Sequence, residues 1–191
     1  HAPSQCCNLV RRASGGGAIL HHLELTYSYV VPVRSRFSDD PLFLYDTFHD
    51  SLIETLKEEW GVSAERHIPL ASIGQVATPE PFLCFERRAA GDVICRGKKI
   101  CGSAQRRGRS AVLQHGSVLL KQSPHTPELP GILELTGVLI PLTELWQRWV
   151  KRLAKALKTD LTPGVLSPEE QVEAHRIADQ KFSSPDWTHR R

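Results

Sequence analysis

The chain has 191 residues, a formal net charge of +3, 40% hydrophobic residues and 24% charged residues. These values are ordinary for a globular domain, and so weak a positive charge is not by itself a nucleic-acid signature. The length fits a single domain, 1–191, and no apolar run reaches membrane-spanning length. No signal peptide is visible, so neither a membrane nor a secreted protein is expected.

The first distinctive stretch is a basic, glycine-lined loop at residues 11–21. Gly15, Gly16 and Gly17 have no side chain to bury, so such a run is useful where a ligand lies against bare backbone or where φ must be positive. The apolar residues 18–20 that follow predict a strand. On these residues alone, a flexible loop with solvated arginines is an equally good interpretation.

A strand and a helix are expected next. Residues 24–33 alternate between two faces and predict a strand ending near Pro32. Asp40 and Pro41 are typical of the N-cap and first turn of a helix, and Gly61 of its end. Large apolar side chains recur between them at helical spacing, whereas His49 is expected at the surface.

Beyond a loop at 62–81, a short strand is expected at 82–85 and a hairpin at 92–106 that turns at Arg96 and Gly97. Residues 111–120 predict another strand and 123–131 an irregular, proline-rich segment. The C-terminal region, 141–191, predicts an amphipathic helix from about Leu142 and a last helix capped by Ser167 and ending near Phe182. The expected fold class is α+β, with a mixed, largely antiparallel sheet flanked by helices.

Five cysteines, an odd number, include the adjacent pair Cys6 and Cys7. No two of them have the spacing of metal ligands, so reduced thiols, no metal site and a cytoplasmic location are expected. Cys95 and Cys101 flank the predicted hairpin turn and are expected to be structural.

Three ordered motifs resemble those of the biotin/lipoate protein ligase superfamily. The first combines Arg-Arg-x-Ser-Gly-Gly-Gly-Ala-Ile-x-His at 11–21 with Glu-Leu-Thr-Tyr-Ser at 24–28. The second is Gly-Lys-Lys-Ile-Cys-Gly-Ser-Ala-Gln at 97–105, and the third is Leu-Gln-His-Gly-Ser at 113–117. The resemblance covers nearly the whole chain and implies a ligase-like catalytic domain. Members usually have further elements upstream, so the N-terminal part of the usual domain is expected to be missing here.

The resemblance implies a catalytic role for Cys84 and Lys99. The cysteine-dependent octanoyltransferases of the superfamily carry a cysteine before an aromatic residue, ahead of the lysine motif, and Cys84-Phe85 occupies that place. The matching lysine of the family contacts the acyl carbonyl or the adenylate phosphate. An ammonium there stabilises charge that develops on oxygen and, close to Cys84, favours the thiolate. Strand alternation sends Lys98 the opposite way, into solvent.

The same resemblance implies a set of substrate-binding residues. His22 stands where the family often has Asp, and His115 is a weaker candidate for a general base. The arginines at 106, 107 and 109 are expected either to dock an acidic acceptor or to form a solvated turn. The expected binding residues are Arg12, Ser14, Gly15, Gly16, Gly17, His21, Gly102, Ser103, Ala104, Gln114, His115 and Gly116.

The function implied is transfer of an octanoyl or lipoyl group, through a Cys84 thioester, to a lysine of a lipoyl domain. Expected partners are acyl carrier protein and lipoyl-domain proteins such as the glycine cleavage H protein and 2-oxoacid dehydrogenase E2 subunits. No cofactor, nucleic acid or membrane is expected, and the protein is expected to be a monomer.

Two alternatives remain open. An ATP-dependent lipoate–protein ligase would use ATP and Mg, form lipoyl-AMP and leave Cys84 idle. A non-catalytic, truncated homologue would only bind an acyl ligand or a lipoyl domain. A biotin ligase is less favoured, because no DNA-binding region or separate C-terminal barrel is visible.

Overall fold

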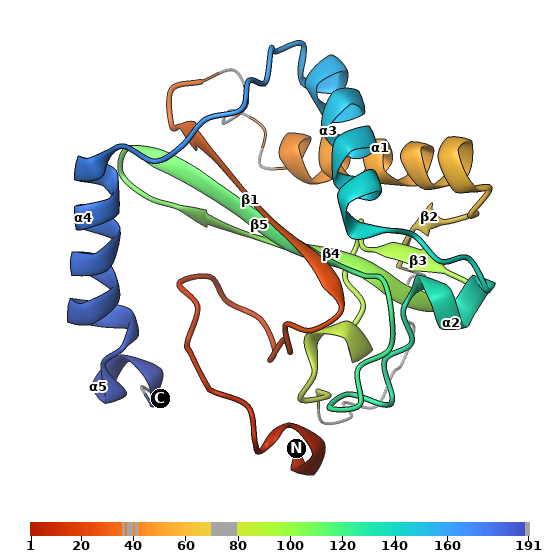
Figure 1. The fold of residues 1–191 in the computed structure, drawn as a ribbon, viewed down its shortest axis with the longest axis horizontal. Helices are drawn as coiled ribbons and strands as arrows, with labels where there is room; N and C mark the ends of the chain where they lie inside the picture. Colours follow the sequence, from red (N-terminus) through yellow and green to blue (C-terminus); the bar gives the residue numbers. More distant parts are fainter. Residues whose placement is uncertain (36, 38–39, 41, 70–79, 190–191) are drawn as a thin grey trace.

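A five-stranded antiparallel sheet with strand order β1-β5-β4-β3-β2 forms the middle of the molecule (Figure 1). The structure, a computed structural model, describes residues 1–35, 37, 40, 42–69 and 80–189. The strands are β1 (Glu24–Pro32), β2 (Glu65–Arg66), β3 (Val93–Cys95), β4 (Lys98–Arg107) and β5 (Ala111–Leu119).

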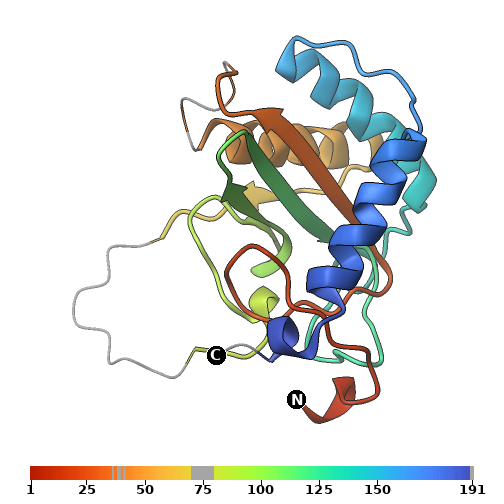
Figure 2. The same cartoon turned by 90° about the vertical axis from the view of Figure 1, so that its left-hand side faces the viewer.

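Two long helices cover one side of this sheet, while the N-terminal segment and its glycine loop cross the other side (Figure 1, Figure 2). The α-helices are α1 (Phe43–Trp60), α2 (Ile132–Thr136), α3 (Leu142–Leu157), α4 (Pro168–Ile177) and α5 (Pro185–Thr188). The short elements are the 3-10 turns η1 (Ala2–Ser4) and η2 (Cys84–Glu86) and the π-helical turn η3 (Ala178–Phe182).

The core lies between the sheet and the pair α1 and α3. Tyr27 of β1 stacks on Phe48 of α1 at 5.0 Å between ring centroids and meets Trp149 of α3 edge-on at 5.2 Å. These aromatic side chains are buried together with the apolar stripe of α1. Their burial and the offset contacts between their rings fix both helices against β1.

The ends of α1 agree in part with the sequence pattern. Gly61 follows the helix with φ of 65°, as expected of a C-terminal glycine. The helix begins at Phe43, later than expected, and Asp40 accepts a hydrogen bond from the Leu42 amide through Oδ1 at 2.8 Å. Pro41, expected in the first turn, lies outside the described residues.

The predicted hairpin is confirmed. Arg96 and Gly97 have φ of 47° and 73°, the positive values of a tight two-residue turn between β3 and β4. The strand expected at 82–85 is wrong: Leu83 forms one isolated parallel bridge with Ala18, and the chain then enters η2. The strand expected at 18–20 is likewise reduced to that isolated bridge, which lies outside the five-stranded sheet.

The C-terminal helices confirm the predicted capping box, since Ser167 Oγ accepts a hydrogen bond from the Glu170 amide at 3.2 Å. In α4 no residue is buried. The end of the chain is tied to the N-terminal segment instead, because Trp187 Nε1 donates to the Arg11 carbonyl at 2.7 Å and Arg11 Nε donates to the Thr188 carbonyl at 3.2 Å. Among the described residues, no helix has the length and apolar character needed to span a membrane.

Candidate active site

A cavity of about 300 Å³ lies between the glycine loop, η2 and the strands β4 and β5. This is the lower end of the usual size of small-molecule sites. Most of the binding and catalytic residues expected from the sequence meet there. Those that line it are Arg12, Gly15, Gly16, Gly17, Cys84, Lys99, Gly102, Ser103, Ala104, His115 and Gly116.

The glycine loop lies directly against the Cys84 thiol. Two backbone hydrogen bonds hold the loop to η2: the Ala18 amide donates to the Phe82 carbonyl at 3.0 Å and the Cys84 amide to the Ala18 carbonyl at 2.8 Å. Gly16 has φ of 102°, and a Cβ built there would lie 4.0 Å from Cys84 Sγ. The loop therefore offers bare backbone to the half-buried thiol, in a conformation that suits glycine.

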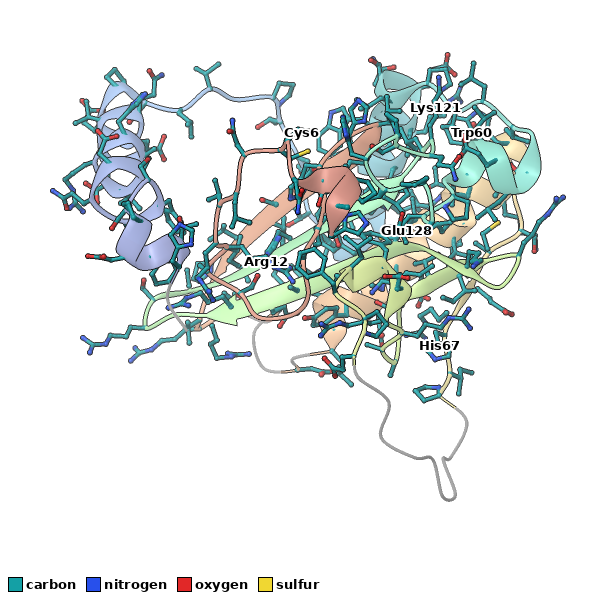
Figure 3. The ribbon with its side chains drawn as sticks, turned by 90° about the horizontal axis from the view of Figure 1, so that it is seen from below. Cys6, Arg12, Trp60, His67, Lys121 and Glu128 are labelled. Atoms are coloured by element: carbon teal, nitrogen blue, oxygen red, sulfur yellow. The ribbon has the colours of Figure 1, made fainter. Side chains whose placement is uncertain are left out.

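Close approach explains the neighbouring glycine as well. A Cβ on Gly17 would lie 3.0 Å from the Phe82 carbonyl oxygen and 3.1 Å from the Cys84 amide nitrogen. Arg12 folds over the loop and donates from Nη2 to the Gly17 carbonyl at 3.1 Å (Figure 3). The loop conformation therefore depends on the absence of side chains at the glycines and on the hydrogen bond from Arg12.

Lys99 forms a buried ion pair with Asp92. The Nζ–Oδ2 distance is 2.8 Å, and only 5% of the Lys99 side chain and 6% of the Asp92 side chain is exposed. Lys99 Nζ also lies 5.4 Å from the centre of the Phe85 ring, beside Cys84. Lys98 is exposed, as the alternation of the strand predicted. Sequence reasoning did not identify Asp92, although an acid at the start of the hairpin was visible.

Gly102 makes room for this ion pair. A Cβ at this position would lie 2.5 Å from Lys99 Cε, 2.8 Å from Lys99 Nζ and 3.1 Å from Asp92 Oδ1. Asp92 is fixed from its other side by the Ala89 amide, which donates to Oδ2 at 2.7 Å. The lysine motif therefore contributes both the ammonium and the space that this ammonium occupies.

The expectation that His49 lies at the surface is wrong. His49 is 1% exposed, with Nδ1 at 2.6 Å from the Gly91 carbonyl and Nε2 at 2.6 Å from Ser103 Oγ. Ser103 also hydrogen-bonds the Tyr27 hydroxyl. Burial lowers the pKa of His49. The helical pattern could have revealed this position, because His49 follows Tyr45 by four residues and precedes Leu52 by three on one face of α1.

His115 links β5 to the glycine loop. Its Nε2 lies 2.6 Å from Ser14 Oγ. Ser14 therefore holds the glycine loop to β5 but does not itself line the cavity. Burial is the main cause that lowers the pKa of His115, and the charges of Arg12 and His21 add to it. A neutral imidazole beside the cavity is the form that this environment favours.

Besides Ser14, two further expected binding residues, Gln114 and His21, do not line the cavity. Gln114 is fully buried and holds strands and helix together: its Nε2 donates to the Leu44 carbonyl at 3.2 Å and its Oε1 accepts from Gln105 Nε2 at 2.9 Å. His21 is 58% exposed and pairs with Glu24 at 2.5 Å, which raises the pKa of His21. Both residues support the strands rather than the cavity.

The cavity presents a thiol in a positively charged surrounding. Its two acids, Glu80 and Asp92, are paired with Arg87 and Lys99, and Arg12 adds a further positive charge. Such a site suits a nucleophilic sulfur that attacks a carbonyl whose oxygen becomes negative. Across the part of the chain that the structure describes, the one group of converging metal-ligand side chains lies elsewhere, at Cys6, Cys7 and His125.

Known proteins are similar to this chain in sequence and in fold. The family model for the lipoyl protein ligase A/B catalytic domain matches residues 2–159. Octanoyltransferase LipM of Brevibacillus brevis is 30% identical over 207 residues, covering 95% of this chain and 74% of that protein. Octanoyltransferase LipM of Symbiobacterium thermophilum is 30% identical over 214 residues, with 95% and 74% covered.

A solved structure of a putative lipoate protein ligase from T. acidophilum with bound lipoic acid superposes with a TM-score of 0.70. It is 22% identical and covers 94% of this chain and 71% of that one, which shows that the fold is shared. The family model covers most of the chain, and the two curated relatives extend the match to nearly its whole length. The chain therefore belongs to the lipoyl protein ligase A/B catalytic-domain family.

Proposed function

We propose that this chain is an octanoyltransferase of protein lipoylation and that Cys84 carries the acyl group as a thioester. The observation that carries the proposal is the position of the Cys84 thiol, against the bare backbone of Gly16 in a cavity that Lys99 also lines. The similarity to proteins named octanoyltransferase supports the class of reaction.

In the first step, the Cys84 thiolate attacks the carbonyl carbon of octanoyl carrier protein. A new S–C bond forms, the thioester bond of the carrier breaks, and the carrier leaves as a thiol that takes up the proton lost by Cys84. The negative oxygen of the tetrahedral intermediate would be stabilised by the ammonium of Lys99, which the ion pair with Asp92 keeps in place.

In the second step, the amine of a lipoyl-domain lysine attacks the Cys84 thioester. The N–C bond of the amide forms, the S–C bond to Cys84 breaks, and the amine proton restores the free thiol or passes to water. The reaction transfers an existing acyl group between sulfur and nitrogen, so it consumes neither ATP nor a redox cofactor. Acyl carrier protein and lipoyl-domain proteins are the partners that this scheme requires.

The arginines at the turn between β4 and β5 are candidates for docking those partners. Arg106, Arg107 and Arg109 are exposed, and Arg106 also donates to the Ala13 carbonyl at 2.5 Å, just before the glycine run. An acidic carrier or acceptor domain that contacts this turn would approach the entrance formed by the loop. Charge complementarity of this kind mainly affects the rate of association and its salt dependence.

Mass spectrometry of the intact protein tests the proposal. Incubation with octanoyl carrier protein should add one octanoyl group, on the peptide that contains Phe82 to Glu86, and hydroxylamine should remove it because thioesters are labile. Cys84→Ser should lose this adduct and the transfer activity, because an alcohol is a far poorer nucleophile than a thiolate near neutral pH. Cys95→Ala is the control, since Cys95 is buried in the core and does not line the cavity.

The two alternatives make different forecasts in the same assay. An ATP-dependent ligase would modify the acceptor with free octanoate or lipoate only in the presence of ATP and Mg, and Cys84→Ser would stay active. A non-catalytic binder would leave the acceptor unmodified under every condition. A fully active, ATP-dependent Cys84→Ser protein would show that Cys84 does not carry the acyl group.

A further inference from the structure

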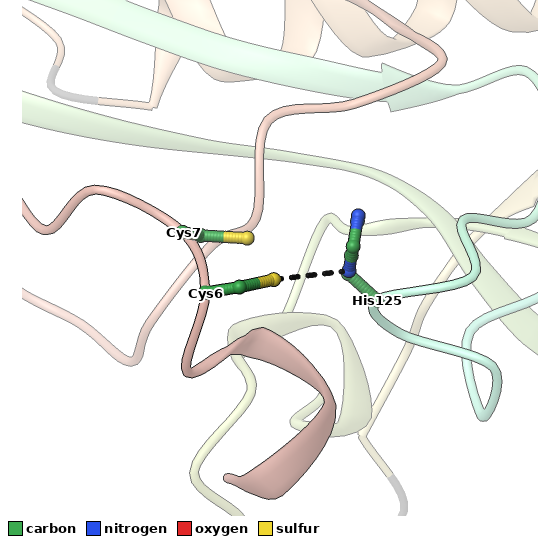
Figure 4. Close-up of side chains that lie close together, drawn as sticks. All are labelled: Cys6, Cys7 and His125. Carbon is green, nitrogen blue, oxygen red and sulfur yellow. Dashed lines mark hydrogen bonds between the residues drawn. The ribbon is translucent and has the colours of Figure 1, made fainter.

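Three side chains that the proposed acyl transfer does not use converge at the N-terminal segment. The thiols of Cys6 and Cys7 and one nitrogen of His125 all lie within 4.8 Å of one another (Figure 4). Cys6 and His125 are 119 positions apart in the chain, so cysteine spacing alone did not predict this cluster. Both cysteines are exposed, and ions in solution can reach them.

The distance between the Cys6 thiol and His125 suits tetrahedral coordination. Zinc binds sulfur at about 2.3 Å and imidazole nitrogen at about 2.0–2.1 Å. In a tetrahedral site those bonds place the sulfur and the nitrogen about 3.6 Å apart. The distance from Cys6 Sγ to His125 Nδ1 is 3.6 Å. Cys6 and His125 therefore already have the separation that a shared ion requires, and Cys7 Sγ lies within 4.8 Å of both ligand atoms.

Both halves of the cluster are braced by contacts that need no ion. The His125 amide donates to Ser123 Oγ at 3.1 Å, and Ser123 is only 3% exposed. On the other side, the Cys7 amide donates to the Ser4 carbonyl at 3.0 Å, which continues the turn η1. His1 also joins the two segments, because its Nε2 lies 2.5 Å from Oε1 of Glu128, a residue of the same loop as His125.

We propose that Cys6, Cys7 and His125 bind one thiophilic divalent cation of the zinc class. Two sulfurs and one imidazole nitrogen form a donor set that such ions prefer over Ca²⁺ or Mg²⁺. Three protein ligands leave a fourth position for water. Coordination at His125 Nδ1 replaces its present contact with the Pro3 carbonyl at 3.2 Å.

The position of the three ligands favours a structural role for the ion. The ion would join the segment that leads into the glycine loop to the loop that follows β5. This inference is independent of the proposed acyl transfer, because none of the three ligands lines the cavity. Metal binding and catalysis can therefore fail or succeed separately.

Titration of the reduced protein with Zn²⁺ against a chelating indicator tests the site, with Co²⁺ as a spectroscopic probe. We expect one tight Zn²⁺ per chain and a thiolate-to-cobalt charge-transfer band. Loss of a residue that merely supports a metal ligand already costs about 10–100-fold in affinity. Cys6→Ser, Cys7→Ser and His125→Asn, which each remove a ligand, should therefore weaken binding by more than tenfold.

Matched controls separate this site from other thiols and histidines. Cys84→Ser and His175→Asn should bind Zn²⁺ as the wild type does, because Cys84 lies in the cavity and His175 on α4. Zn²⁺ should also slow amide hydrogen exchange at residues 2–9, and His125→Asn should abolish this protection. The ligand variants should keep the wild-type melting temperature without metal, since two of the three side chains are exposed.

Several outcomes would overturn the proposal. They are the absence of tight Zn²⁺ binding, unchanged affinity in a Cys6→Ser/Cys7→Ser double variant, and a Co²⁺ spectrum without the thiolate band. Loss of binding in Cys84→Ser would instead place the ion at the cavity, and it would overturn the proposal equally.

Discussion

The two walls of the cavity are held in place in different ways. The sheet wall, formed by β4 and β5, belongs to the hydrogen-bonded ladder. The Lys99–Asp92 pair lines the cavity on this side, and the buried His49 lies behind it. The loop wall, formed by residues 12–17 and η2, has exposed glycines and only a few backbone contacts. Changes in the sheet wall should therefore affect stability and activity together, and changes in the loop wall mainly activity.

The largest expected effect comes from breaking the buried ion pair of the sheet wall. Asp92→Ala leaves the Lys99 ammonium buried without its partner and should lower the free energy of unfolding by about 3–5 kcal/mol. Urea denaturation measures this change. An Asp92→Asn/Lys99→Met double variant, which removes both charges at similar volume, should recover most of the loss. A double variant as unstable as the single one would mean that the charge is not what the fold depends on.

The same double variant isolates the role of Lys99 in transfer. It should be folded yet slower by about 10²–10³ in octanoyl transfer, the usual cost of removing one group that stabilises charge on oxygen. Single-turnover acylation of Cys84 is the measurement. Lys98→Met is the matched control and should keep the wild-type rate, because Lys98 is exposed. Equal effects at the two lysines would contradict the assignment.

On the loop wall, Gly16→Val should act on the substrate more than on the fold. A β-branched residue resists the φ of 102°, and its Cβ would displace the Arg12 guanidinium, which lies 2.5 Å away. Strain of this kind costs about 1–3 kcal/mol at most, and an exposed loop can relax part of it. Acylation of Cys84 should fall by more than about tenfold, the equivalent of 1.4 kcal/mol.

Gly137→Val is the control for backbone strain alone. Gly137 has φ of 77° and open space around its Cβ position, and it does not line the cavity. It should lose stability to a similar extent but keep its rate of acylation. Unchanged acylation in a folded Gly16→Val protein would show that the glycine loop is not the wall on which the acyl group lies.

Much of this arrangement could be predicted from local sequence signals. Alternation predicted β1, and a strand and a turn were also expected where β5 and the turn at Arg96 and Gly97 are found, because such patterns depend on neighbours along the chain. The three motifs, together with the place of Cys84-Phe85 ahead of the lysine motif, predicted residues that the cavity lining brings together: Cys84, Lys99 and the glycines. The acyl-transfer roles of these residues stay predictions.

The contacts that sequence reasoning missed join residues of different elements, which a pattern within one element does not reveal. Asp92 is explained by its pairing with Lys99 across a hairpin whose register is shifted by a bulge at Val93 and Ile94. The segment 82–85 was expected to be a strand because it is apolar, but the pairing with Ala18 ends after one bridge. Gln114 was grouped with the cavity because of its motif, although its own neighbours, Leu44 and Gln105, bury it.

The smallest expected effect is a pH dependence that arises behind the sheet wall. His49 is buried and neutral in the folded protein, and burial holds its pKa below that of the unfolded chain, near 6.5. As the pH falls below this unfolded value, the unfolded chain binds a proton that the folded protein does not. The contribution of His49 to stability is therefore complete above about pH 6.5 and is lost as the pH falls toward the lower, folded pKa, with a slope of at most about 1.4 kcal/mol per pH unit.

Urea denaturation between about pH 7.5 and about pH 5, which brackets the unfolded pKa, measures this contribution. The free energy of unfolding should depend less steeply on pH in His49→Asn than in the wild type. The Asn amide can still donate to the Gly91 carbonyl and accept from Ser103. His115 contributes in the same direction, so the difference between wild type and variant, not the total slope, isolates His49. Identical slopes in wild type and His49→Asn would show that this imidazole is not kept neutral by the fold.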